Sequence, residues 1–490
     1  MAFRNWKLEF EDQRLPRVIP WAFIRGVAIA VAAVVAVAAA GLWVWPGWLL
    51  ERPWQRSGPA PDRIALVFSS DIGGQLEPAG CTRRRWGGIA RTAGYIQSVT
   101  DPPIVLAMDV GEMTAGPLAW QQQGWEHALR AMGAAGYRAA NLGAREASLA
   151  VDDLRRVAAA SPVPLISANV VDAATGSPVA PTHVSFEVSN LRVSVVGVVQ
   201  NDPRAAPGAG LAIADPSRSL ESLLPGLAAR SDVLVLLAAC DIETMRALAS
   251  AHPQIDVILG GRVTAASRTI ERVGACRLAY QADHGQLLGR MDVAIRDSGR
   301  PGDATAGVVL LDESVAEPAD MLSLVEQYNA QLAAIAQKSG LAKLGLNSST
   351  PAAAAGSYAG SEACRSCHAE AHAVWIASAH SRALASLTQR RRDSNPDCLR
   401  CHVLDAGAPQ GYAGMESAAL RGNVQCESCH GPANRHVANR NLGTGVSEAD
   451  ALLPKVSPQS CVSCHDCTRS PDFNFSVYWK KIQHGKNKTR

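Results

Sequence analysis

Apolar runs that suit buried strands alternate with helical patterns between residues 62 and 315. The runs include RIALVFSSD, IVLAMDVGE, LRVSVVGVV, DVLVLLAAC and IDVILGG. Several are almost continuous Val, Leu and Ile, as expected for strands that are buried on both faces. Because such runs alternate with helical segments, we predict an α/β domain over residues 62–315. Its length is ample for one buried core.

One apolar stretch near the N-terminus differs from these runs. No charged residue occurs from Gly26 to Leu50, a length that fits a membrane span. Five basic residues precede the stretch and two follow it closely, so the positive-inside rule places residues 1–25 in the cytoplasm. A cleaved signal peptide with its site at Ala38–Ala40 is the alternative. The apolar run continues past that site, which favours a retained anchor over residues 26–50.

A five-residue pattern, C-x-x-C-H, occurs four times in the last third of the chain. Two thiols at this spacing can each bond to one porphyrin, and the next residue places an imidazole under the iron. We therefore predict four covalently attached haem c groups, each with its motif histidine as proximal ligand. Structural zinc is the alternative, but zinc ligands come as two paired halves rather than as identical units. The motifs are Cys364, Cys367 and His368; Cys398, Cys401 and His402; Cys426, Cys429 and His430; and Cys461, Cys464 and His465.

Four further histidines lie in the same segment: His372, His380, His436 and His484. An iron with histidine on both faces suits electron transfer alone, whereas an open face invites ligand binding or catalysis. Four haems and four spare histidines match in number, so each is a candidate distal ligand. A surface or packing role is the alternative for any one of them.

Three stretches of this segment resemble one family. They are YAGSEACRSCHAEAHAVWIASAHSRAL from Tyr358, VQCESCHGPANRH from Val424 and DFNFSVYWKKIQHGK from Asp472. They are similar to the multihaem cytochromes c related to the tetrahaem cytochrome of nitrifying bacteria. The resemblance implies a mostly helical tetrahaem domain over residues 358–490. It also implies that His380, His436 and His484 are distal ligands.

His372 has no obvious counterpart in that family. It lies four residues after His368, on the same face of a predicted helix. It remains a candidate for the fourth distal ligand. If it does not bind an iron, one haem is five-coordinate and that iron can bind a small ligand.

The order of the strand-like runs in residues 62–315 resembles the catalytic domain of the 5′-nucleotidases, within the calcineurin-like metallophosphoesterases. The matching stretches are SSDIGGQLEP, DVGE, GYRAANLGAREA, LLAACD and ILGGR. Enzymes of that family use two metal ions to generate a hydroxide and stabilise the displaced oxygens. Their ligand positions carry other residues here: Gly73, Glu112, Ala144, Arg145, Ala238 or Ala239, Arg262 and Thr264.

The resemblance therefore implies an α/β metallophosphoesterase-like sandwich that has lost its phosphoesterase activity. Asp71 and Asp109 remain, but two carboxylates do not make a two-metal site. Arg145 and Arg262 are candidates to converge where the metals would lie and to bind an anion there.

The rest of the chain contains a connection between the two predicted domains and four cysteines outside the C-x-x-C-H motifs. A helix near Pro318–Ser339 and an Ala/Gly/Ser-rich stretch make residues 316–357 a helix and linker. In an oxidising compartment Cys240 and Cys276 could form a disulfide, although sequence does not establish the pairing. Cys81 stands alone where some nucleotidase-like relatives have two thiols, and Cys467 follows the last motif.

Haem is attached to C-x-x-C-H outside the cytoplasm. We therefore expect a single-pass protein of the inner (cytoplasmic) membrane with its soluble domains in the periplasm. The formal net charge of +3 identifies no partner, and nothing indicates nucleic-acid binding. We expect a non-catalytic electron carrier with redox partner proteins, a quinol-oxidising complex of the membrane being one candidate. The alternatives are a haem oxidoreductase acting on a small nitrogen or sulfur species at a five-coordinate haem, and a working periplasmic phosphoesterase.

Overall fold

The computed structural model describes residues 58–80, 85–282, 284–344, 346, 357–408, 410–442, 456–466, 469–470 and 472–485. The predicted leader and anchor, most of the linker after residue 346, Cys81 and Cys467 lie outside these residues. Within the described part of the chain, no helix combines the length and the apolar character that crossing a membrane requires.

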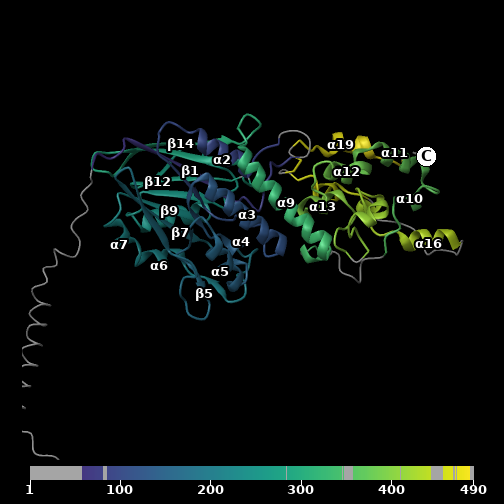
Figure 1. Ribbon diagram of the computed structural model, residues 1–490, viewed down its shortest axis with the longest axis horizontal. Coiled ribbons are helices and arrows are strands. Elements are labelled where there is room, and N and C mark those ends of the chain that lie inside the picture. The colour runs from purple at the N-terminus through teal and green to yellow at the C-terminus, as the bar shows by residue number, and fades with distance from the viewer. Residues whose placement is uncertain are drawn as a thin grey trace, which may run out of the picture. The chain divides into compact units, whose positions relative to one another are not determined.

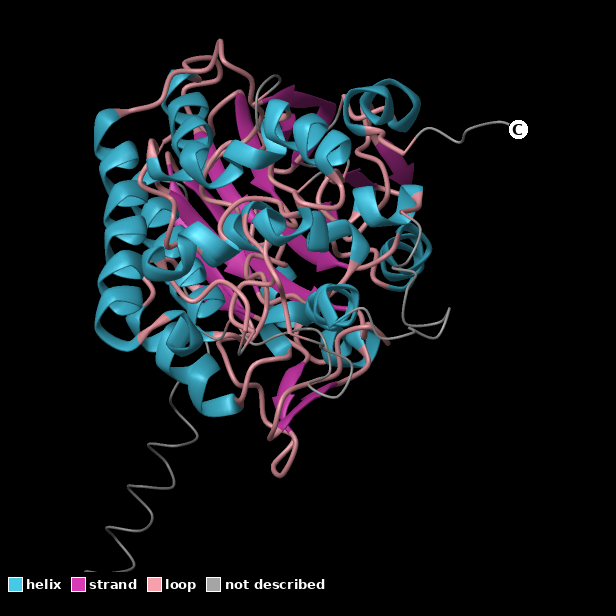
Figure 2. Cartoon of the chain, turned by 90° about the vertical axis from the view of Figure 1, so that its right-hand side faces the viewer, coloured by secondary structure: helices cyan, strands magenta, loops and turns pink. Residues whose placement is uncertain are grey.

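Two six-stranded sheets form the centre of the α/β domain (Figure 2). The first sheet mixes parallel and antiparallel neighbours, because β13 is antiparallel to both β1 and β14. In order, its strands are β14 (Pro301–Leu310), β13 (Leu287–Ile295), β1 (Arg63–Ser69), β2 (Val105–Asp109), β3 (Tyr137–Asn141) and β4 (Leu165–Ile166). The second sheet runs β11 (Glu271–Val273), β12 (Cys276–Tyr280), β10 (Val257–Gly261), β9 (Val233–Ala239), β7 (Leu191–Val199) and β6 (His183–Val188). A small hairpin-like sheet pairs β5 (Val170–Asp172) with β8 (Leu211–Ile213).

Apolar side chains from both sheets pack into one shared core. Leu66 and Met108 of the first sheet join Val235 and Leu259 of the second in a single buried cluster. Every residue of β9 is buried, so its side chains are covered on both faces, as the continuous apolar run predicted. The α/β sandwich expected from the sequence is therefore confirmed.

Helices cover the outer face of each sheet, which completes four layers (Figure 1). The first sheet carries α2 (Ile89–Ser98), α3 (Ala119–Ala135), α4 (Ala144–Ala147), α5 (Val151–Ala160) and α9 (Ala319–Ser339). The second sheet carries α6 (Pro216–Glu221), α7 (Leu224–Ala228) and α8 (Ile242–Ala251).

The C-terminal segment consists of short helices joined by turns (Figure 1). After η1 (Leu341–Leu344) come α10 (Ser361–Cys364), α11 (Ala369–Ala377), η2 (Ala379–Arg382), α12 (Ala383–Thr388), α13 (Pro396–His402), η3 (Met415–Ser417) and α14 (Ala418–Arg421). They are followed by α15 (Cys426–His430), α16 (Asn434–Leu442), α18 (Pro458–Val462) and α19 (Phe475–Ile482). The predicted mostly helical character of this segment is confirmed.

This segment shares part of its core with the α/β domain. Leu399 of α13 and Leu387 of α12 belong to the same buried cluster as Leu332 and Tyr328 of α9. The helix that follows the α/β domain is therefore also a packing partner of the C-terminal segment.

Candidate functional site: paired histidines and a closed acidic centre

Each C-x-x-C-H motif lies on one turn of helix or beside it. The second motif ends α13, and the third motif is the whole of α15. In the first and fourth motifs, the backbone N–H of His368 and of His465 donates to the carbonyl of the motif's first cysteine, at 2.9 Å in both cases. This turn places the two thiols and the imidazole of one motif close together, as covalent haem attachment requires.

Three motif histidines face three of the predicted distal histidines. The ring centroids of His368 and His436 are 6.3 Å apart. Those of His465 and His380 are 6.2 Å apart, and those of His430 and His484 are 5.8 Å apart.

This spacing fits a metal ion held between two imidazoles. With metal–nitrogen bonds of roughly 2 Å and each centroid about 1 Å behind its nitrogen, two axial imidazoles have centroids roughly 6 Å apart. All three observed separations lie close to that value. The residues present therefore fit a haem iron with histidine on both faces.

The other ring nitrogens of several of these histidines have partners. His465 Nδ1 lies 2.9 Å from the Ser470 hydroxyl, and His484 Nδ1 lies 2.8 Å from the Ile482 carbonyl oxygen. Such partners select the tautomer and turn Nε2 toward a metal. No pattern in the sequence predicted these supporting contacts, because they depend on groups brought together by folding.

His402 of the second motif is oriented in the same way but faces no imidazole. Its Nδ1 lies 2.8 Å from the Ala383 carbonyl oxygen and 3.3 Å from the Ser386 hydroxyl. Among the described residues, no ring contact joins His402 to another histidine. His402 thus differs from the other three motif histidines, each of which faces a second imidazole.

His372 is buried rather than exposed, and it binds a carboxylate. Its Nε2 lies 3.2 Å from Glu362 Oε1, and its ring packs on Trp375 with centroids 5.3 Å apart. Nε2 is also the nitrogen that His465 and His484 leave for a metal, because their Nδ1 atoms have other partners. Because Glu362 already engages it, the contacts of His372 are those of a packing residue, and its role as a distal ligand stays a prediction.

Thiol contacts show which motifs are neighbours. The side chains of Cys364 in the first motif and Cys426 in the third are close enough to interact. Cys401 of the second motif and Cys464 of the fourth form another such pair. Motifs one and three therefore lie side by side, as do motifs two and four.

A buried glutamate connects the third motif to the residues just before the first motif. Sequence reasoning overlooked it. Glu427, the variable residue after Cys426, accepts backbone N–H groups of Ala359 at 2.9 Å, Gly360 at 2.8 Å and Ala433 at 2.7 Å. Its side chain is almost fully buried. A charged residue inside a haem motif was the available signal, but its partners in residues 359–360 lie far away in sequence.

In the α/β domain, three carboxylates, Asp71, Glu112 and Asp202, lie at or next to the positions where the metallophosphoesterase resemblance places metal ligands. Two guanidinium groups fill the space between them, and we call this cluster the closed acidic centre. Arg145 lies 2.8 Å from Asp71 Oδ1 and 3.6 Å from Glu112 Oε2. Arg262 lies 2.9 Å from Asp202 Oδ2 and 3.8 Å from Glu112 Oε1. The two arginines converge on Glu112, as the sequence predicted. Because each already has carboxylate partners, the arrangement gives no support to an anion site.

The remaining groups of this centre are also occupied. His284 Nδ1 lies 3.0 Å from Asp71 Oδ2, a contact that sequence reasoning did not foresee. Glu112 accepts the backbone N–H of Ala144 at 2.7 Å, and Glu146 accepts that of Glu112 at 3.0 Å. Burial raises the pKa of both glutamates. Within the described residues, no group of three or more His, Cys, Asp or Glu side chains could hold a metal ion.

Asp109 lies at the end of β2 beneath this centre. It is fully buried, and its carboxylate accepts the Ser69 hydroxyl at 2.6 Å and the Gly111 N–H at 2.8 Å. Burial raises the pKa of Asp109 well above its usual range. No guanidinium or ammonium group pairs with it within the described part of the chain, so its ionised form is costly.

The disulfide considered between Cys240 and Cys276 is not formed, because both thiols are free and buried. Cys240 directly follows β9, whereas Cys276 begins β12. Both strands are parallel to β10, which lies between them. The two cysteines therefore lie at opposite ends of the sheet. Burial raises the pKa of each thiol to about 12.

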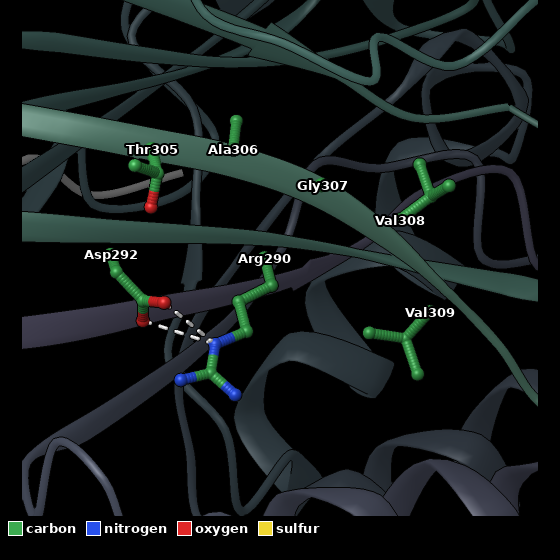
Figure 3. Close-up of a pocket in the computed structure, with 7 residues that line it drawn as sticks. All are labelled: Arg290, Asp292, Thr305, Ala306, Gly307, Val308 and Val309. Carbon is green, nitrogen blue, oxygen red and sulfur yellow. Dashed lines mark hydrogen bonds and ion pairs between the residues drawn. The ribbon is translucent and has the colours of Figure 1, made fainter.

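A pocket of about 280 Å³ lies elsewhere, against β13 and β14 (Figure 3). Its charged side chains, Arg290 and Asp292, bind each other at 3.0 Å. It contains no residue of a haem motif or of the closed acidic centre, and it carries no further candidate chemistry. The lining residues are Arg290, Asp292, Thr305, Ala306, Gly307, Val308 and Val309.

Comparison with known proteins finds similarity to a family model and to one relative in the C-terminal segment. Residues 363–431 match the family described as Cytochrome c554 and c-prime. Cytochrome c-554 of Nitrosomonas europaea is 27% identical over 146 residues, which cover 24% of this chain and 62% of that protein. The chain thus spans less than two thirds of this relative. These similarities agree with the resemblance to multihaem cytochromes c that the motifs of residues 358–490 carry.

Two solved structures are similar to about half of this chain. A 5′-nucleotidase precursor from Thermus thermophilus has a TM-score of 0.49 at 20% identity, covering 56% of this chain and 60% of its own. The calcineurin-like phosphoesterase YfkN from Bacillus subtilis has a TM-score of 0.48 at 19% identity, covering 56% and 99%.

Replacing Arg145 should destabilise the protein by removing one cationic partner from both Asp71 and Glu112. For Arg145→Met we expect the free energy of unfolding to fall by about 1–2 kcal/mol, less than for a fully buried pair because the side chain is partly exposed. Arg204 is the matched control, since it pairs with Asp202 but its side chain is 86% exposed. Arg204→Met should change stability by no more than about 0.5 kcal/mol. Urea unfolding followed by circular dichroism measures both, and equal losses would contradict the closed-centre interpretation.

Asp109 should make stability depend on pH. Its folded-state pKa is raised, so its stabilising contribution is complete below its unfolded pKa of about 3.9 and is lost as pH rises through the folded value. Asp109→Asn removes this titration while keeping the shape. Relative to the parent protein, the variant should therefore gain stability as pH rises above about 3.9, and the gain should stop growing once the pH has passed the folded value. The measurement is the free energy of unfolding in urea, as a function of pH, for both proteins. If the difference between them does not change with pH, Asp109 does not titrate as inferred.

Proposed function

We propose that the protein is an exported tetrahaem electron carrier in which three irons have two histidine ligands. The observation that carries this proposal is the set of three facing pairs, His368 with His436, His465 with His380 and His430 with His484. Each pair joins a motif histidine to a histidine from another helix or turn. When bound, the haem groups would supply one-electron chemistry, and the three facing pairs of imidazoles would hold three of the irons on both faces.

The thiol contacts suggest an order for the haems. Motif one lies beside motif three, and motif two lies beside motif four. Cys429 of the third motif is close enough to Cys461 and Cys464 of the fourth for their charges to interact. These contacts support a continuous path from the first motif through the third and fourth to the second.

A second candidate function rests on His402. The absence of a facing imidazole within the described residues favours an open axial position on the second motif. Nδ1 of His402 is engaged by the Ala383 carbonyl, so Nε2 is left for the proximal bond. An open iron at the end of an electron path suits a reaction with a small nitrogen or sulfur species, which would make the protein a haem oxidoreductase.

Placement at the membrane is part of the proposal. The uncharged stretch from Gly26 to Leu50 and the basic residues before it support a single anchor with a cytoplasmic N-terminus. The haem domain would then lie in the periplasm, within reach of a membrane quinol-oxidising complex or another redox partner protein. The closed acidic centre supports an α/β domain without phosphoesterase activity.

The test is low-temperature electron paramagnetic resonance of the full-length holoprotein. We expect low-spin ferric signals from three haems and one high-spin signal that changes on addition of nitric oxide. His380→Ala should convert one low-spin signal into a second high-spin signal, because it removes the imidazole opposite His465. His372→Ala is the matched control and should leave every signal unchanged.

Two outcomes would count against the proposal. Four low-spin signals that do not respond to nitric oxide would exclude the open iron and leave a pure electron carrier. A new high-spin signal in His372→Ala would make that histidine an axial ligand, and the pairing with Glu362 would then be wrong.

A further inference from the structure

Helix α13, which carries the second motif, begins at a residue that is tied to the α/β domain. Asn395 is the N-cap of this helix, and its side-chain oxygen accepts the Asp397 N–H at 3.0 Å. Its side-chain amide also donates to Asn329 Oδ1 of α9 at 3.1 Å. One side chain thus both starts the helix and binds it to a helix of the other domain.

A buried arginine reinforces this connection. Arg392 lies three residues before Asn395 and is 9% exposed. Its guanidinium forms an ion pair with Glu326 of α9 at 2.7 Å and another with Glu77 of the α/β domain. A buried charge is tolerated only with such partners, so Arg392 strongly constrains the geometry between the two parts.

Glu77 closes the network. Asn329 donates its side-chain amide to Glu77 Oε1 at 2.9 Å, so Glu77 binds both Asn329 and Arg392. The network therefore consists of Glu77, Glu326 and Asn329 on one side and of Arg392 and Asn395 on the other.

Glu77 belongs to the loop that leaves the closed acidic centre. Asp71 at the start of this loop is held by Arg145, and the backbone N–H of Gly73 donates to the Glu112 carbonyl at 3.0 Å. Gly73 has a positive φ of 57°, a conformation that favours glycine. The arginine-filled centre therefore fixes the loop that presents Glu77 to Arg392.

The first and third motifs are held differently. Glu427 and Gln425 bind backbone groups of residues 359–361 within the haem segment itself. In the second motif, Leu399 is fully buried in the cluster that includes Tyr328 and Leu332 of α9. The polar network and this apolar contact thus act on the same helix.

We infer that the α/β domain serves as a clamp that sets the position of the open-iron helix α13, with Arg392 and Asn395 as the positioning residues. The inference rests on the proposed function in that it takes the iron on Cys398–His402 to be open. A clamp at the N-terminus of α13 fixes the direction of the helix and hence the position of His402 relative to the bound porphyrin. Through this clamp, the α/β domain would have a role in positioning part of the haem segment.

The first measurement is hydrogen exchange by mass spectrometry on the full-length holoprotein. Arg392→Met should raise exchange in the peptide that contains α13 by about tenfold, which corresponds to about 1.4 kcal/mol. The peptide that contains α15 should not change. Arg390→Met is the matched control, because Arg390 is exposed and two residues away, and it should leave both peptides unchanged.

Asn395→Ser provides a milder variant in case Arg392→Met does not fold. Serine is a good N-cap and keeps the acceptor for Asp397, but it lacks the amide that binds Asn329. Exchange in α13 should therefore rise although the cap is retained. Two outcomes would overturn the clamp. One is equal exchange of α13 in Arg392→Met and Arg390→Met. The other applies if Arg392→Met does not fold, and it is unchanged exchange of α13 in Asn395→Ser.

A spectroscopic measurement separates this inference from the proposed function. In Arg392→Met and Asn395→Ser, the g-values of the high-spin ferric signal should shift and the carbon monoxide dissociation rate of the reduced protein should change by about threefold or more. Low-spin signals should stay the same. If the parent protein shows no high-spin signal and binds no carbon monoxide, the open iron is wrong, and hydrogen exchange alone then decides whether α13 is clamped. A normal signal and rate in both variants would refute positioning of the open iron.

Discussion

The distance between facing imidazoles is the constraint on which the haem segment depends. A porphyrin with its iron fits between two histidines only if the rings stand about 6 Å apart. Three helices or turns therefore have to approach three motif histidines to that separation, and they do so in a segment with little ordinary apolar core. The short helices and the buried Glu427 are the means by which the chain satisfies this requirement. In the second motif, His402 faces no imidazole of the described residues, and this distance requirement does not apply. The contacts that support this motif come from the α/β domain instead.

The closed acidic centre shows how a cluster of carboxylates can be held together by arginine side chains. Carboxylates that lie close together repel one another unless positive charge is placed among them. Arg145 and Arg262 place that charge permanently, through covalently attached side chains that converge on Glu112. Guanidinium groups hold carboxylates by directional bonds, so the loops keep their places.

Much of this could be predicted from local patterns. Strand runs of buried residues predicted the α/β sandwich, and the spacing of Cys and His predicted the haem motifs. The pairing of His380 with His465 could not be read from spacing, because it joins residues 85 positions apart through the fold. The same limit applies to Cys240 and Cys276, whose separation depends on the direction of β10 between their strands. Contacts such as Asn395 with Asn329 leave no sequence signal beyond a helix N-cap.

The two parts of the chain are therefore linked by more than a connecting peptide. If α9 acted only as a spacer, its face toward the haem segment would need no buried polar groups. Instead Asn329 is almost fully buried and uses its side chain on both sides, toward Glu77 and toward Asn395. Buried polar groups are costly when unpaired and geometrically demanding when paired. Their presence at the start of α13 argues that the orientation of the second motif, rather than mere proximity of the two domains, is what this contact determines.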